Sequence, residues 1–191
     1  MTVYKKGGGS IYQFNRINVK TSQLQLFINY LQQKYEQQLA EIEQFYPINW
    51  YMEINNHQIW APSTTLAFTH LGKRQLSVCF LLHHIEKEIN TKHSITDPLL
   101  LKNVSECFVE FLFLHELKHM QQFCNGLTLK QYKKLGSYKT NPYEEQATQF
   151  ALETMKLAHP EKFELLQFIL NKGKINHLNE SKWQQHFIDC K

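Results

Sequence analysis

The sequence predicts an α+β fold in which helices surround one small sheet. Over residues 21–45, apolar residues recur every three or four positions, as in an amphipathic helix. Over residues 65–82, apolar and polar residues alternate, as in half-buried strands. From residue 97 onward the helical spacing returns, punctuated by cap residues. We therefore expect a long N-terminal helix, a sheet, and a helical C-terminal half.

The composition is that of one globular domain. The 191 residues are enough to bury a core, with 42% of them apolar and 13% aromatic. Residues 1–10 end in Gly7-Gly8-Gly9-Ser10 and are expected to form a flexible tail, which leaves residues 11–191 as the single domain. The net charge of +4 comes from scattered lysines, so no nucleic-acid partner is expected.

A cytoplasmic location is expected, with export by a leaderless route as the alternative. Residues 1–6 lack the apolar core of a signal peptide. No apolar run approaches the about 20 residues of a membrane span. The cysteines form no Cys-x-x-Cys pair, and free thiols indicate a reducing compartment. These cysteines are Cys79, Cys107, Cys124 and Cys190.

The first helix is expected over residues 21–45. Thr21-Ser22 supply its start signals, and Pro47 ends it. Its outer face is rich in glutamine. Its apolar face consists of Leu24, Phe27, Ile28, Leu31, Tyr35, Leu39, Ile42 and Phe45.

A mostly antiparallel sheet of three or four strands is expected next. Residues 48–54 and 58–61 have the composition of short strands. Residues 65–71 and 74–82 are expected to form two strands, because apolar side chains recur at every second position. Gly72-Lys73 between them suits a two-residue hairpin turn.

A central helix follows after an ambiguous stretch. Residues 83–96 read either as a strand end or as a short helix. Their His83-His84 pair is a second candidate metal group, but an exposed polar end is the favoured interpretation. Asp97-Pro98 supplies an N-cap and a first-turn proline, so a helix is expected from there to residue 123 or 124. Asn125-Gly126 is a typical stop.

The remaining chain is expected to be helical. A short helix is predicted over residues 128–135, closed by Gly136. Asn141-Pro142 repeats the combination of N-cap and first-turn proline and starts another helix. Two further helices are expected near residues 161–171 and 180–189.

The central helix carries the motif His-Glu-x-x-His at His115, Glu116 and His119. Residues four apart share a helix face, so the two imidazoles can take two corners of a zinc tetrahedron. Glu116 lies about 100° round the helix from His115, near the metal without being forced to bind it. It can then accept a proton from a water activated by the metal.

The context of the motif favours a metal site over three polar residues on an exposed helix face. Residues 111–114 are all apolar and run directly into His115, and Leu117 and Met120 follow. A helix that is apolar around most of its circumference is buried. Buried histidine and glutamate side chains need partners, and a metal ion would satisfy them.

A third protein ligand is needed, with one position left open for water. A third histidine in the longer motif His-Glu-x-x-His-x-x-Gly-x-x-His is excluded, because Gln122 and Asn125 occupy the two later positions. A glutamate from a later helix is the other common solution. Glu144 and Glu145 follow His119 by 25 and 26 residues, which leaves room for a loop and a returning helix.

Together with this motif, the stretch Glu-Glu-Gln-Ala-Thr-Gln-Phe-Ala at residues 144–151 resembles the gluzincin-type zinc metallopeptidases. The resemblance is greatest to small bacterial and phage peptidases that cleave repressors or stress-response regulators, whose glutamate helix has the form Glu-x-Glu-Ala-x-x-Phe-Ala. It covers roughly residues 65–155 and implies a zincin-like fold with Glu144 as third ligand. The chain departs from the pattern at Gln146, where the family has a second glutamate.

From the residues alone, Glu144 and Glu145 remain alternatives. With Asn141 as N-cap, Glu144 lies at position N3, where a carboxylate can complete a capping box, and Glu145 would then be the ligand. Ala147 and Ala151 lie on the Glu144 face, and small residues there suit close packing against the motif helix. Glu144 is therefore favoured.

Three further roles around the site are expected. The resemblance implies a residue that stabilises the oxyanion, and Tyr138 is preferred over Tyr132 and Tyr143, although simple ring packing would also explain each tyrosine. Gln122 lies within one turn of His119 and is a candidate to orient it. An edge strand at residues 66–71 is a candidate to pair with an extended substrate.

The expected function is hydrolysis of peptide bonds with one Zn²⁺ per chain, bound by His115, His119 and Glu144. Glu116 is expected to be the general base and to pass the proton to the leaving amine. The partner would be a peptide or protein substrate. One alternative is a zincin-fold binding or regulatory module without peptidase activity, although such a module needs no general base. Another is a phage- or toxin-associated protease.

Overall fold

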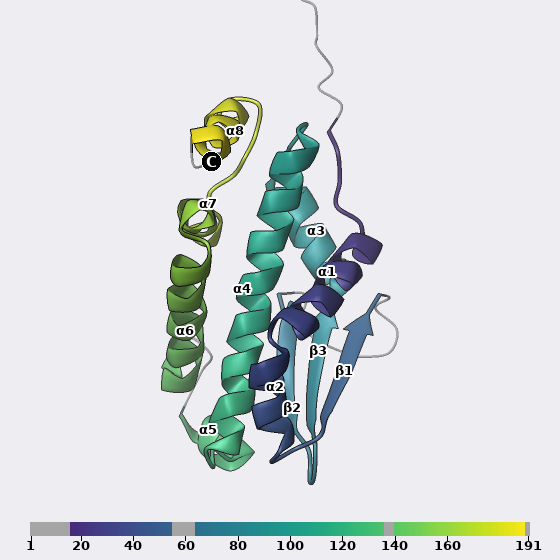
Figure 1. Cartoon of the computed structure of the whole chain (residues 1–191), viewed down its shortest axis with the longest axis vertical. Helices are drawn as coiled ribbons and strands as arrows, with labels where there is room; N and C mark the ends of the chain where they lie inside the picture. Colours follow the sequence, from purple (N-terminus) through teal and green to yellow (C-terminus); the bar gives the residue numbers. More distant parts are fainter. Residues whose placement is uncertain (1–15, 55–63, 136–139, 190–191) are drawn as a thin grey trace, which may run out of the picture.

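The computed structural model describes residues 16–54, 64–135 and 140–189 (Figure 1). Within these ranges the fold is α+β, as predicted, and the tail at residues 1–10 lies outside them. In chain order the elements are α1 (Thr21–Lys34), α2 (Glu36–Glu43), β1 (Ile48–Glu53), β2 (Ala67–Leu71), β3 (Leu76–Leu81), α3 (Leu82–Lys92), α4 (Pro98–Cys124), α5 (Leu129–Lys134), α6 (Pro142–Ala158), α7 (Pro160–Leu170) and α8 (Glu180–Asp189).

The long helix predicted over residues 21–45 is divided in two, so that prediction is wrong. The break lies at Tyr35, whose φ of −108° and ψ of 22° leave the helical region. The Tyr35 hydroxyl donates a hydrogen bond of 2.7 Å to Glu110 on α4. The apolar spacing continues across the break, so periodicity alone could not detect it.

The sheet is mixed, which corrects the prediction of a mostly antiparallel one. Its strand order is β1-β3-β2, with β1 parallel and β2 antiparallel to β3. The chain crosses from one edge of the sheet to the other between β1 and β2, so both of these strands flank β3. The β2–β3 turn spans four residues, 72–75, instead of the predicted two. The strand predicted at residues 58–61 lies outside the described residues.

Residues 82–92 form helix α3, which settles the ambiguity at residues 83–96. The prediction that this stretch is exposed is wrong for His84. The His84 side chain is buried, and its Nδ1 lies 2.7 Å from the Thr65 carbonyl oxygen. Neither His83 nor His84 belongs to a group that could hold a metal among the described residues.

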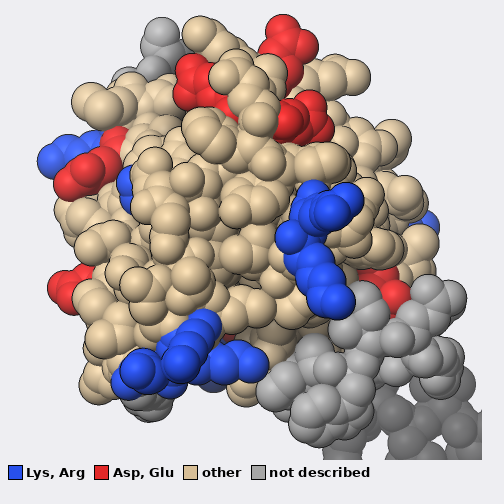
Figure 2. Space-filling view, turned by 90° about the horizontal axis from the view of Figure 1, so that it is seen from below, with Lys and Arg blue, Asp and Glu red and all other residues tan. Residues whose placement is uncertain are grey.

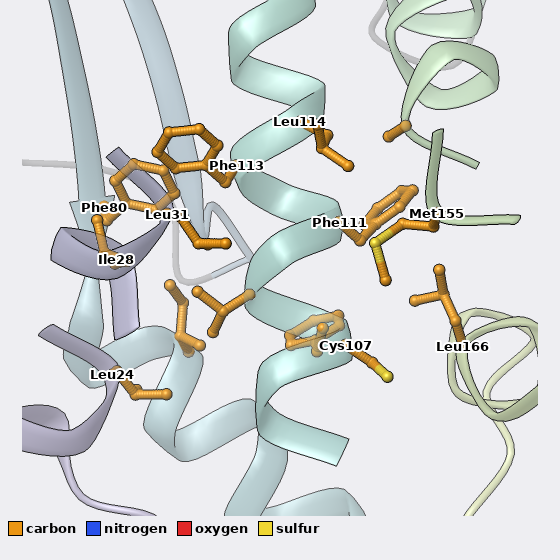
Figure 3. Packing of buried hydrophobic residues seen from close by; sticks show 14 of the residues in the cluster. Leu24, Ile28, Leu31, Phe80, Cys107, Phe111, Phe113, Leu114, Met155 and Leu166 are labelled. Carbon is orange, nitrogen blue, oxygen red and sulfur yellow. The ribbon is translucent and has the colours of Figure 1, made fainter. Parts of the chain in front are cut away.

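Helix α4 begins and ends as predicted and forms the centre of the molecule. The Asp97 side chain accepts a hydrogen bond of 2.6 Å from the Leu100 amide, and Gly126, at a φ of 91°, follows the helix end. Figure 3 shows Phe113 pointing toward Phe80 of β3, while Phe111 points to the opposite side. Because apolar partners pack on both sides, most of the helix circumference is buried.

The C-terminal helices cover the side of α4 opposite the sheet (Figure 1). Helices α6 and α7 pack directly on α4, and α8 contacts α7. The buried Glu180 carboxylate accepts hydrogen bonds from the amides of Thr96 and Asp97 at 2.7 and 2.8 Å, which ties α8 to the start of α4.

The predictions of free cysteines and of no membrane-spanning segment can be compared with this fold. Cys79, Cys107 and Cys124 are free thiols, as predicted, while Cys190 lies outside the described residues. In the described part of the chain, no helix combines the length and the apolar character that crossing a membrane requires.

The end of the molecule that carries α5 and the β2–β3 turn shows Lys and Arg side chains in separate groups with uncharged surface between them (Figure 2).

Candidate metal centre

Helices α4 and α6 bring His115, His119 and Glu144 together. The Nε2 atoms of the two histidines are 3.0 Å apart. The Glu144 carboxylate lies 3.2 Å from Nε2 of His115 and 3.3 Å from Nε2 of His119. All three side chains are buried, and their candidate ligand atoms lie within 4.8 Å of one another.

Of the two candidate glutamates, the structure brings Glu144 to the histidines and not Glu145. Glu144 is 5% exposed, whereas Glu145 is exposed on the outer side of α6. Ala147 and Ala151 are fully buried on the same face as Glu144. Their small side chains allow α6 to approach α4 closely, as the sequence argument anticipated.

The donor set fits a cation. The Gln122 side-chain nitrogen donates to the Tyr143 carbonyl oxygen, so its oxygen faces His119 Nδ1 at 2.9 Å. Neutral His119 therefore carries its proton on Nδ1 and a lone pair on Nε2. That lone pair lies 3.3 Å from a Glu144 oxygen, and two acceptors so close need a cation between them, either a proton or a metal ion.

The charges of the site shift two ionisation equilibria. Burial alone would raise the pKa of Glu144, but hydrogen bonds with His115, His119 and Tyr132 outweigh it and hold the pKa below its usual range. Burial alone would lower the pKa of His119, but its hydrogen bond with Glu144 and the charges of Glu116 and Glu144 raise it. Both shifts follow from a carboxylate placed against two imidazoles.

Glu116 lies beside the three candidate ligands, and a residue of the sheet holds its side chain by a hydrogen bond. The Thr69 hydroxyl on β2 donates a hydrogen bond of 2.8 Å to one oxygen of its carboxylate. Burial raises the pKa of Glu116, although the neighbouring histidines and this hydrogen bond oppose the shift. The carboxylate is thus fixed in orientation and favours its protonated form more than a carboxylate in water does.

A cavity of about 310 Å³ opens on these residues and gives room for a ligand. Its walls come from the edge strand β2, from α4 and from α5. The residues that line it besides His115, Glu116, His119 and Glu144 are Thr65, Ala67, Phe68, Thr69, Phe123, Leu129 and Tyr132.

Among the described residues, the tyrosine whose hydroxyl reaches the site is Tyr132, whereas the sequence analysis preferred Tyr138. Tyr132 donates a hydrogen bond to Glu144, and its ring meets the His119 ring edge-on at 6.1 Å between centroids. The preferred candidate, Tyr138, lies outside the described residues. Tyr143 contributes its backbone carbonyl, which accepts from Gln122.

Sequence reasoning missed Thr69 and its contact with Glu116. The two residues are 47 positions apart and belong to different kinds of element. The only available signal was the strand alternation, which places Thr69 on one face with Ala67 and Leu71.

Comparison of the chain with protein-family models, with curated proteins and with solved structures gives no match. Its function is therefore inferred from the chemistry of the site.

Proposed function

We propose that this chain is a zinc-dependent metallopeptidase with a zincin-like fold of the gluzincin type. The observation that carries the proposal is the buried group of His115, His119 and Glu144, with the Glu116 carboxylate beside it in the same cavity. Two imidazoles and one carboxylate form a donor set that catalytic zinc sites use.

The choice of zinc follows from the donors. Imidazole nitrogen suits zinc, whereas calcium and magnesium prefer oxygen ligands. Three protein donors also leave one position open, which distinguishes a catalytic site from a closed structural one. The adjoining cavity supplies the space for a water and a substrate.

Glu116 is the proposed general base. Zinc, when bound, supplies Lewis acidity that lowers the pKa of a water to about 7. With zinc bound by His115, His119 and Glu144, Glu116 would accept a proton from the water that attacks the scissile carbonyl carbon, and would return that proton to the leaving amine. The Thr69 hydroxyl holds the carboxylate in position for both transfers.

The proposed substrate is a peptide in extended conformation. Among the residues that the structure describes, strand β2 lies at an edge of the sheet and pairs on one side only, with β3. Ala67, Phe68 and Thr69 of this strand line the cavity. A substrate backbone can pair with such an edge, while its side chains contact the apolar walls formed by Phe123 and Leu129.

Metal content of the purified protein tests the site. We expect about one zinc per chain in wild type and in Glu145→Ala, and loss of zinc in Glu144→Ala. Glu145→Ala is the matched control, because it removes the same group from the next, exposed position. Wild-type protein that takes up no zinc even when supplied with it would contradict the proposal.

Glu116→Gln tests catalysis separately from metal binding. It should keep zinc and lose casein cleavage by at least about 100-fold, because general-base catalysis contributes about 10²–10⁴ in rate. Unchanged cleavage by a zinc-loaded Glu116→Gln protein would remove Glu116 from the mechanism. A wild-type protein that binds zinc but cleaves no casein or unfolded-protein substrate would favour the binding-module alternative.

A further inference from the structure

We infer that Gln122 is a positioning residue that connects the two helices of the metal site before a metal binds. This inference rests on the proposed metal site. Gln122 lies on α4 one turn after His119 and is 6% exposed. Both polar atoms of its side-chain amide are hydrogen-bonded, one toward each helix.

Toward α4, Gln122 determines which nitrogen of His119 is available for a metal. Its oxygen lies 2.9 Å from Nδ1, which must donate because the Gln122 oxygen can only accept. The proton is thereby kept on Nδ1, and Nε2 keeps the lone pair that faces His115 and Glu144. Partners of this kind orient metal-binding histidines.

Toward α6, Gln122 holds the turn that carries Glu144. Its nitrogen donates to the Tyr143 carbonyl oxygen at 3.0 Å and to the Gln146 side-chain oxygen at 3.3 Å. Tyr143 immediately precedes Glu144 in the chain, and Gln146 lies two positions after it. Gln146 is also the position at which the chain departs from the gluzincin pattern, and here its amide oxygen serves as the acceptor.

A primary amide is needed for both tasks, because one group must accept from an imidazole and donate to a carbonyl. Glutamate could accept from His119 but could not donate to α6 in its charged form, and methionine has the length of glutamine without either bond. Holding the two helices together in advance reduces the conformational freedom that metal binding must remove. Gln122 therefore raises metal affinity without touching the metal.

Zinc affinity measured by competition with a coloured chelator, at one fixed pH, tests the first task. We expect Gln122→Met to bind zinc about 10–100-fold more weakly than wild type. Gln122→Glu should lose less affinity, because it still accepts from His119. Gln121→Met is the matched control on the neighbouring, less buried position and should bind like wild type. Wild-type affinity in Gln122→Met would overturn the inference.

Hydrogen exchange and imidazole ¹⁵N spectra of the metal-free proteins test both tasks without zinc. The amides of Glu144 and Glu145, which bond to the Asn141 carbonyl, should exchange faster in Gln122→Met and in Gln122→Glu. At a pH high enough for the His119 ring to be neutral, its proton should stay on Nδ1 in wild type and Gln122→Glu, but both tautomers should be populated in Gln122→Met. Unchanged exchange and tautomer would overturn the inference.

Different results would contradict the proposed metal site and the proposed role of Gln122. If wild type binds no zinc, the metal site is wrong, while exchange in the metal-free proteins still decides whether Gln122 joins α4 and α6. If Gln122→Met does not fold, the exchange and tautomer of Gln122→Glu decide the same question.

Discussion

At the scale of single residues, Thr69 is the contact that links the sheet to the proposed base. Its hydroxyl, on β2, donates to the Glu116 carboxylate on α4 at 2.8 Å, in a partly buried position beside the cavity. Removal of one such hydrogen bond costs about 0.5–1.5 kcal/mol, which corresponds to a rate loss of about 2–10-fold when the bond orients a reacting group.

We therefore predict that Thr69→Val lowers kcat for casein cleavage about 2–10-fold while zinc content stays at the wild-type level. Thr69→Ser keeps a hydroxyl and should restore most of the rate. Steady-state kinetics with elemental analysis of the same samples is the measurement. Equal rates for the valine and serine variants would show that the hydroxyl does not contribute.

A second single-residue prediction concerns His93, which is 4% exposed. Its Nδ1 accepts a hydrogen bond of 3.2 Å from the Ile175 amide, which requires the neutral ring. Burial, supported by the charges of Lys92 and Arg16 and opposed by Glu88, lowers the pKa of His93 to about 4. The unfolded chain has a histidine pKa of about 6.5, so the folded state disfavours protonation.

The sign of the pH effect follows from that shift. The stabilisation from neutral His93 is complete above about pH 6.5 and is lost as the pH falls toward 4, by about 3 kcal/mol in total. Denaturant unfolding between pH 7 and pH 4 measures it, with His93→Gln as a variant that cannot titrate. The wild-type free energy of unfolding should fall more steeply than that of the variant, and parallel curves would contradict the prediction.

At the scale of elements, a buried carboxylate on α4 connects this helix to the α1–α2 break and to the α6–α7 junction. Glu110 on α4 is 3% exposed and accepts from Lys34 at the end of α1 and from Tyr35 at the α1–α2 break, at 2.6 and 2.7 Å. His159, at the junction of α6 and α7, lies 3.4 Å from its other oxygen. These contacts connect the α1–α2 break and the α6–α7 junction to α4.

We predict that Glu110→Ala destabilises the fold by about 3–5 kcal/mol, because it leaves partly buried polar groups without their counter-charge. Glu106→Ala, one turn earlier on α4, removes a more exposed carboxylate and should cost about 1 kcal/mol or less. Chemical denaturation compares the two. A similar small cost for both would mean that Glu110 is not needed to hold the break.

At the scale of the whole molecule, the proposed metal joins the central helix to the C-terminal half. His115 and His119 belong to α4 and Glu144 to α6, so a bound ion would stabilise the packing between them. A ligand that binds only the folded state at about 1,000 times its Kd adds about 4 kcal/mol of stability.

Zinc should therefore raise the Tm of the metal-free protein by about 10 °C, since about 1 kcal/mol shifts Tm by about 2–4 °C in a chain of this size. Magnesium should have no comparable effect, because it prefers oxygen ligands. Glu144→Ala should lose most of the shift and Glu145→Ala should keep it. Calorimetry or thermal circular dichroism measures these values, and an equal shift in both variants would contradict the assigned ligand.

The sequence by itself determined the features that depend on neighbours along the chain. The limits of α4 follow from Asp97-Pro98 and Gly126, and the common face of His115 and His119 follows from helical spacing. The preference for Glu144 also came from spacing, since Ala147 and Ala151 lie one and two turns further along its face. Each of these is a local relation that backbone geometry and hydrogen bonding enforce wherever the helix lies.

Only the tertiary structure decided the features that join distant segments. The parallel pairing of β1 with β3, the break at Tyr35, and the contacts of Thr69 and Gln122 each connect different elements. No periodic pattern records such contacts, because they depend on how buried surfaces fit and on which buried polar groups must find a partner. The candidate metal ligands, and Gln122 as a partner of His119, could thus be named from the chain. The contact of Thr69 with Glu116 and the bonds from Gln122 to α6 required the fold.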